Sequence, residues 1–309
     1  RRDAPRHYPD LDHVDRVWVA AWLEDVSPRQ VTRYRIRDGA LEIAPRLDHV
    51  ERDRMTLDNG LAMVAVGPDG LATLTDHAAG TRFERLLEIE SEADHGDLYT
   101  PDVEPATLRH ARTRRVRVVT GGPLVGAIER DWTLATADGG MVHGRTVVAL
   151  HAAEAGIRVR IEFDSWASDH RLRLKLPAGL TEIDVAAPFG IERRRAGRLD
   201  RSWPDEAALP TAPASGWLAS TDPNLPFRVE TPGFFEYQLT ESGDLAITLL
   251  RAVGQLSRPD GKLRRGNAGW LTETPGAQEH GRHVIELAIG FSGWRSSLPW
   301  ALGIRGVIG

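Results

Sequence analysis

Cysteine is absent from this 309-residue chain, which excludes disulfides, thiolate zinc sites and cysteine nucleophiles. No apolar run approaches the roughly 20 residues that cross a bilayer as a helix, so we expect no membrane partner. Long basic blocks are also missing and the net charge is −5, which argues against nucleic acid as a partner. These absences fit a cytoplasmic protein. The chain begins without Met or an apolar signal segment, and we interpret it as part of a longer protein.

Helical periodicity is scarce, whereas alternation with a period of two is common. In residues 158–163, for example, Val159, Ile161 and Phe163 alternate with charged side chains, and residues 171–176 repeat the pattern. Half-buried antiparallel strands require this alternation because successive side chains leave opposite faces. Turn sequences such as GPDG at 67–70 separate the alternating runs. The chain is therefore predicted to be all-β, a sandwich or a barrel.

Residues 193–226 differ from the rest of the chain. They are rich in Pro, Ala, Arg and Asp, and they include the sequence SWPDEAALPTAPASGW. Proline disrupts both helices and central strands, so we expect no regular element there. The segment is predicted to be a long surface excursion between strands.

Residues 88–102, EIESEADHGDLYTPD, concentrate carboxylates and suggest a metal site, a catalytic acid pair or a solvated turn. A calcium loop counted back from Gly96 would need acidic or amide residues where Ser91, Ala93 and His95 stand, so that pattern fails. Asp94 and Asp97 could act as a glycosidase acid pair, but acids this close in sequence usually bond their own turn amides. We therefore expect the acids to form a solvated strand edge.

Four blocks of sequence follow one another in an informative order. They are TLDNGLAMVAVGPDGLATLTDHAAG with GDLYTP, RIEFDSWASDHRLRLKLPAGL, AAPFGIERR, and GFFEYQLTESGDLAITLLRAVGQLSRPDGKLRRGNAGWLTETPGAQEHGRH. Each resembles a segment of the large β-domain of glycoside hydrolase family 38, the α-mannosidases. The matching positions include Asp58-Asn59, Pro68-Asp69-Gly70, Asp76, Gly80, Gly96-Asp97, Tyr99, Pro101 and Asp169-His170-Arg171-Leu172. Ser165 departs from the family pattern, in which Asn is frequent. The resemblance covers nearly the whole chain.

The resemblance implies a large antiparallel β-supersandwich, of the galactose-mutarotase-like type, in residues 49–309. A small strand pair in residues 1–48 would precede it. The family's zinc, held by His and Asp side chains, and its Asp nucleophile for a retaining mechanism belong to an N-terminal α/β domain. This chain shows no counterpart of that domain. We therefore expect the chain alone to be inactive, with no catalytic residue, metal ligand or cofactor of its own.

By resemblance, the chain would be the C-terminal β portion of an α-mannosidase-like hydrolase. It would brace its own N-terminal catalytic domain and lend loop residues to the binding of a mannose-containing glycan or a mannosylated small molecule. Tyr99 is the first candidate, because its ring can cover the C–H face of a sugar and its hydroxyl can hydrogen-bond. Asp97, Arg264 and Asn267 are the other substrate-binding candidates, and the Gly96-Asp97 turn is expected to orient Tyr99. Arg264 could hold a sugar hydroxyl or pin a loop carboxylate, and Asn267 lies in the same loop.

Alternative interpretations of the chain are a free carbohydrate-binding module and, less favoured, a mutarotase-like sugar enzyme that pairs His151 with Glu162. Titration with mannosides would discriminate the module. His170 is interpreted as a structural hydrogen-bonding residue at a strand start rather than a general base. His280 and His283 are zinc ligands by type, but no third ligand stands at motif spacing. Among the nine tryptophans, Trp203 and Trp217 are the first to test for exposure to a sugar.

Overall fold

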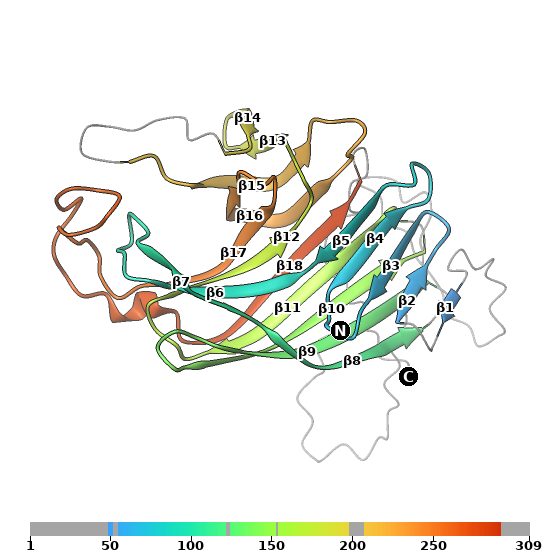
Figure 1. Ribbon diagram of the computed structural model, residues 1–309, viewed down its shortest axis with the longest axis horizontal. Helices are drawn as coiled ribbons and strands as arrows, with labels where there is room; N and C mark the ends of the chain where they lie inside the picture. The colour runs from blue at the N-terminus through green and yellow to red at the C-terminus, as the bar shows by residue number, and fades with distance from the viewer. Residues whose placement is uncertain (1–48, 52–54, 122–123, 153, 198–206, 292–309) are drawn as a thin grey trace, which may run out of the picture. The chain divides into compact units, whose positions relative to one another are not determined.

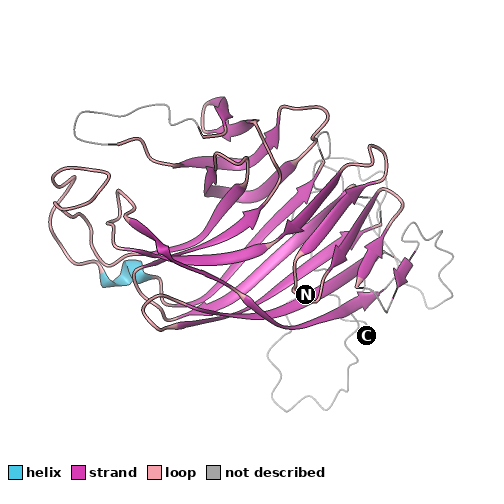
Figure 2. Cartoon of the chain, in the orientation of Figure 1, coloured by secondary structure: helices cyan, strands magenta, loops and turns pink. Residues whose placement is uncertain are grey.

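The computed structural model describes residues 49–51, 55–121, 124–152, 154–197 and 207–291. All of them belong to one compact unit of the chain. The strand pair predicted for residues 1–48 lies outside the described residues. Strands dominate the described part, and Figure 2 shows one short 3-10 turn, η1 (Pro275–Gln278), among them. The prediction of an all-β, antiparallel fold is confirmed.

A five-stranded sheet comes first in the described chain. Its strands pair in sequence order and are antiparallel: β1 (His49–Glu51), β2 (Thr56–Asp58), β3 (Ala62–Val66), β4 (Ala72–Asp76) and β5 (Arg82–Leu86). In β3 and β4, buried side chains alternate with half-buried ones, as one-sided packing requires. The GPDG sequence forms the turn between them, where Gly70 has a φ of 79° that favours glycine.

A much larger sheet of 13 strands follows in the described residues. Its main path runs β7-β6-β12-β17-β16-β18-β11-β10-β9-β8, with β13, β14 and β15 attached through β16. The strands are β6 (Glu88–Asp94), β7 (Val103–His110), β8 (Arg112–Gly121), β9 (Val125–Ala135), β10 (Met141–His151), β11 (Gly156–Ser165), β12 (His170–Leu176), β13 (Glu182–Ala187), β14 (Gly190–Arg195), β15 (Thr211–Ser220), β16 (Arg228–Leu239), β17 (Leu245–Ala252) and β18 (Gly281–Gly290).

One continuous segment, Val103–Gly121, supplies both ends of that main path. Its first half, β7, pairs with β6, and its second half, β8, pairs with β9 at the other end of the path. Ala111 lies between the halves, and its N–H donates to the carbonyl of Ile89 at 2.8 Å. The large sheet therefore curls until its two ends meet in a single stretch of chain, and Figure 1 shows this curvature.

The core lies between the two sheets and inside the curve of the large one. Leu57 and Leu74 of the first sheet belong to the same buried cluster as Ile161, Leu174 and Ile247 of the second. Most of these side chains occupy the inward positions of alternating strands. The polar side chains between them therefore lie on the opposite faces of the sheets.

The predicted excursion at residues 193–226 is partly wrong. β14 continues to Arg195, and β15 occupies residues 211–220 inside the Pro-rich segment. Pro213 is accommodated because β13 pairs only with residues 218–220 of β15, so one edge of the strand is open at Pro213. Trp203 lies outside the described residues. Trp217 is half-buried, with the Arg228 guanidinium 4.5 Å from its ring centroid.

Candidate functional site

The turn that carries Tyr99 is built around Asp97. One carboxylate oxygen, Oδ1, accepts hydrogen bonds from the backbone N–H groups of Tyr99 (2.9 Å) and Thr100 (2.8 Å). The other, Oδ2, accepts from the N–H of Arg258 (2.6 Å) and from the guanidinium of Arg264. Burial alone would raise the pKa of Asp97, but the bond from Arg264 and the backbone bonds outweigh it and lower that pKa. Asp97 therefore holds the turn as an ionised acceptor.

Arg264 reaches this turn from a loop about 165 residues later, and its guanidinium is buried. It donates to Asp97 and to the hydroxyl of Thr100, and its Nε donates to the carbonyl of Gly266 at 3.3 Å. Its Cζ lies 5.8 Å from the centroid of the Tyr99 ring. Of the two roles considered for Arg264, the structure places it in contact with the loop carboxylate.

Tyr99 projects from this support and is 51% exposed. Gly269 packs against it so closely that a Cβ at that position would lie 3.0 Å from the Tyr99 hydroxyl oxygen. The loop that contains Gly269 is shaped by Ser257, whose hydroxyl accepts the N–H groups of Ala268 and Gly269. Asn267, exposed in the same loop, donates from its side chain to the carbonyl of Gly269 at 2.9 Å. The structure thus brings Tyr99, Asp97, Arg264 and Asn267 together.

Three of the four acids of β6 are buried, so the predicted solvated strand edge is wrong. Glu90, Glu92 and Asp94 are each at most 5% exposed, because β6 lies between β7 and β12 rather than at an edge. β12 supplies the partners of the two glutamates: Arg171 lies 2.6 Å from Glu92, and Arg173 lies 2.6 Å from Glu90. These pairs satisfy charges that would otherwise be costly to bury.

Asp94, the last residue of β6, connects this strand to the turn that carries Tyr99 through hydrogen bonds. Its Oδ1 accepts the N–H groups of Gly96 and Asp102, both at 2.9 Å, and its Oδ2 accepts from Arg251 Nε at 2.7 Å. Burial would raise its pKa, but the hydrogen bond and the charge of Arg251, with the backbone bonds, lower it. Asp94 and Asp97 are thus each engaged by an arginine and by turn amides, and neither resembles a free catalytic acid.

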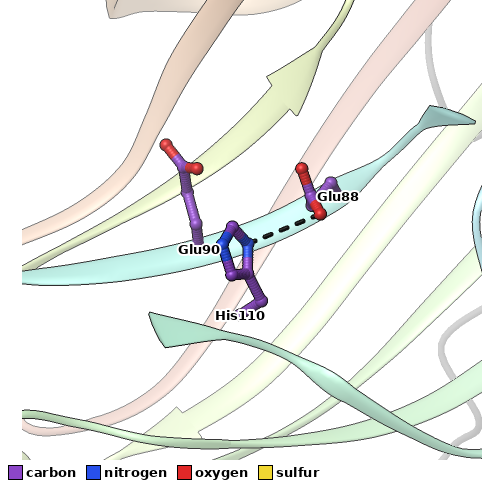
Figure 3. Close-up of side chains that lie close together, drawn as sticks. All are labelled: Glu88, Glu90 and His110. Carbon is purple, nitrogen blue, oxygen red and sulfur yellow. Dashed lines mark ion pairs between the residues drawn. The ribbon is translucent and has the colours of Figure 1, made fainter. Parts of the chain in front are cut away.

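Glu88, Glu90 and His110 form a group whose ligand atoms lie close enough together to hold a cation. Figure 3 shows the His110 ring against Glu88, with Nδ1 3.4 Å from Oε1. Glu90 is already paired with Arg173, so a metal ion would have to compete with that guanidinium. The group therefore does not fit the zinc that the resemblance implies, and that zinc was expected in a different domain.

The histidines take structural positions. His170 is buried between the hydroxyls of Ser91 (3.1 Å) and Ser165 (3.2 Å), and burial lowers its pKa to about 4. The structural interpretation of His170 is confirmed. His280 contacts Ser168 at 3.1 Å, and His283 contacts the carbonyl of Glu279 at 2.6 Å, so each ring already has a polar partner.

The His151–Glu162 pair of the mutarotase hypothesis does not form. Glu162 is paired across the strands with Arg145, six positions from His151 and so about 20 Å along β10. Hydrogen bonds from Arg160 and Arg282, with Arg145 nearby, lower the pKa of Glu162 to about 2. Such a carboxylate is a poor general base near neutral pH.

Two exposed tryptophans escaped prediction. Trp166 is 71% exposed beside the ring of His280, and Trp270 is 83% exposed next to Gly269 in the loop that contacts Tyr99. Trp270 stands in the GNAGWLTETP sequence, between two loop glycines and a proline. This loop context could have indicated that Trp270 is exposed, because a tryptophan outside an alternating strand pattern is not predicted to face the core.

The chain is similar to known proteins in sequence and in fold. A curated protein of Halalkalibacterium halodurans, named "Putative mannosylglycerate hydrolase", is 24% identical over an alignment of 275 residues, and the match covers 76% of this chain and 28% of that protein. An α-mannosidase from Enterococcus faecalis superposes with a TM-score of 0.66 at 17% identity, over 79% of this chain and 30% of its own. A glycosyl hydrolase family 38 protein from the same organism gives a TM-score of 0.63 at 16% identity, over 79% and 31%.

The resemblance to glycoside hydrolase family 38 is confirmed. The shared part is the fold of a β region, and this chain spans less than a third of each of these three proteins. No protein-family model matches the sequence. The described residues contain no helix long and apolar enough to span a membrane. The chain thus has the fold of a β region found in family 38 proteins.

Proposed function

We propose that this chain is the C-terminal β portion of a family 38 α-mannosidase-like hydrolase. It braces an N-terminal catalytic domain and lends Tyr99 to the binding of a mannose-containing substrate. The parent reaction would be retaining hydrolysis, with zinc and the nucleophile supplied by the catalytic domain. The likeness to proteins named as an α-mannosidase and a mannosylglycerate hydrolase supports the reaction class.

The observation that carries this proposal is the construction of the Tyr99 turn. Asp97, fixed by Arg264 and by Arg258 N–H, orients a tyrosine that is about half exposed, at 51%. A tyrosine that served packing alone would be buried. Tyr99 is instead kept at the surface by the buried Asp97–Arg264 ion pair and by the close approach of Gly269. In this arrangement Arg264 and Asp97 position Tyr99, and Asn267 shapes the facing loop.

The parent protein with Tyr99→Phe tests the proposal. Loss of one hydroxyl hydrogen bond to substrate should lower kcat/KM by up to about tenfold, while the thermal midpoint stays unchanged. Arg264→Ala should lower kcat/KM further, because the turn loses its anchor. Phe189→Leu, at a fully exposed position between β13 and β14, is the control and should leave the rate unchanged. Unchanged kcat/KM in both test variants would remove this turn from the active region.

A further inference from the structure

A separate polar cleft of about 310 Å³ lies beside the Tyr99 turn. Gly96, Gly254, Pro275 and six polar side chains line it: His95, Asp169, Gln255, Arg258, Glu273 and Gln278. It adjoins the turn directly, because the N–H of Leu98 donates to the carbonyl of Gln255 at 3.1 Å. Tyr99 and Arg264 do not line it. Its volume is at the lower end of the range for small-molecule pockets, so it has room for one compact ligand.

The walls of this polar cleft are fixed before any ligand arrives. Asp169 has a left-handed φ of 48° and exchanges two hydrogen bonds with Gln278: its N–H donates to Oε1 at 2.9 Å, and its Oδ1 accepts from Nε2 at 2.8 Å. Gly254 allows the close approach, since a Cβ there would lie 2.7 Å from Gln278 Nε2. A backbone held in a sparsely populated region by such contacts is a frequent feature of binding sites.

The chemistry of the cleft lining favours a ligand that both donates and accepts hydrogen bonds. Asp169 Oδ2 and the Glu273 carboxylate have no hydrogen-bond partner among the described residues, so both can accept from a ligand. Arg258 and the Gln255 amide can donate, although Arg258 also pairs with Asp260 at 2.9 Å. No large apolar side chain lines the cleft. Hydroxyl groups of a sugar match such a set, because each one donates and accepts.

Other ligand classes fit less well. Two carboxylates face one arginine, and that arginine is already neutralised by Asp260, so an anion would be repelled. Among the described residues, the group of acids and histidine that meets metal-ligand spacing is Glu88, Glu90 and His110, away from this lining. A small organic cation is the competing occupant, and the experiment below separates it.

We propose that this polar cleft binds one neutral, polyhydroxylated sugar residue. Asp169 and Glu273 accept from its hydroxyls, while Arg258 and Gln255 donate to them. The inference goes beyond the proposed function, which uses Tyr99 and not the side chains that line this cleft. The experiment below distinguishes a free sugar from one residue of a glycan whose next residue reaches Tyr99.

Backbone N–H chemical shifts of the isotopically labelled chain provide the test, with methyl α-mannoside, an α-linked mannobiose and ethanolamine as probes. We expect methyl α-mannoside to shift the Gly96, Gly254 and Asp169 signals, with a dissociation constant of about 10 mM or tighter. Asp169→Asn keeps the amide contact to Gln278 and tolerates the left-handed backbone, yet it removes the charge, so binding should weaken at least about fivefold.

Glu273→Gln, at an exposed position, should weaken binding similarly without affecting the fold. Glu241→Gln, exposed in the β16–β17 turn, is the matched control and should bind like the wild type. Tighter binding of mannobiose that is lost in Tyr99→Phe would identify a glycan residue, and equal binding of the two sugars would identify a free sugar. Absence of cleft shifts at 50 mM sugar (about five times the expected dissociation constant), shifts with ethanolamine alone, or unchanged binding in both variants would overturn the inference. None of these outcomes depends on the activity assay for Tyr99.

Discussion

Single residues in this chain determine how the exposed Tyr99 side chain is oriented. Asp97 and Arg264 stabilise the turn that carries Tyr99, and Gly269 limits the space beside the Tyr99 ring. The sequence predicted which residues would gather here, because the resemblance supplied them. It did not predict that Arg264 would be buried, since that depends on Thr100, which is distant in sequence, meeting its guanidinium together with nearby Ser257.

Gly269→Ala should displace the Tyr99 ring without unfolding the protein. The added Cβ would lie 3.0 Å from the hydroxyl oxygen and 3.3 Å from a ring carbon, which is closer than normal packing allows. We expect kcat/KM of the parent protein to fall by at least as much as in Tyr99→Phe. Gly276→Ala is the matched control, because a Cβ there meets no atom within 4 Å. If both alanine variants retain wild-type rates, the position of the Tyr99 ring does not matter for activity.

At the scale of elements, charged side chains form a ladder across β8, β9, β10, β11 and β18. Arg117 pairs with Glu129, Arg145 reaches both Glu129 and Glu162, and Glu162 also binds Arg160 and Arg282. The alternation that predicted these strands also placed the charges on one face. The same reasoning failed for β6, because its partners on β12 lie 79 residues away and a strand's neighbours cannot be read from its own pattern.

Glu162 should make the stability of the chain depend on pH at the acid end. Its folded pKa of about 2 lies below the ordinary 4.5, so its stabilising effect is complete above pH 4.5 and is lost as the pH falls through about 2. The free energies of unfolding of wild type and Glu162→Gln should therefore differ at pH 7 and converge toward pH 2. Denaturant titrations at several pH values measure this difference.

The arginines of this ladder are partly exposed, so solvent and salt screen the pairs and the difference at pH 7 should be modest. Addition of 1 M NaCl should reduce it further, because the Debye length falls to about 3 Å. Glu241→Gln serves as the control, since it changes an exposed charge outside the ladder. A difference that stays constant from pH 7 to pH 2 would contradict this role of Glu162.

For the molecule as a whole, the decisive feature is the segment Val103–Gly121, which joins the two ends of the large sheet. The sequence predicted many antiparallel strands but not this closure. Alternation reports which face of a strand is buried, whereas closure depends on one segment pairing with β6 through its first half and with β9 through its second. The order of strands in space was available only through the resemblance to family 38.

Ala111→Pro tests how much this closure contributes to stability. Proline removes the N–H that Ala111 donates to Ile89 and restricts the backbone where β7 passes into β8. We expect the free energy of unfolding to fall by about 2–4 kcal/mol, measured by denaturant titration. Ala111→Ser, which keeps the N–H, should change it by less than about 1 kcal/mol. Equal stability of the two variants would show that the junction tolerates the loss of its hydrogen bond.

The shared segment also constrains how the gene can vary in length. An inserted residue within β7 or β8 moves the side chains that follow it to the other face of the sheet. A compensating register shift must therefore occur before the paired strand ends. The pairing register already shifts between Ser91 and Ala93, between Thr113 and Arg115, and between Val118 and Thr120. Insertions and deletions during evolution should therefore collect in the hairpin turns of other strands, whereas residues 103–121 should keep nearly the same length among homologues.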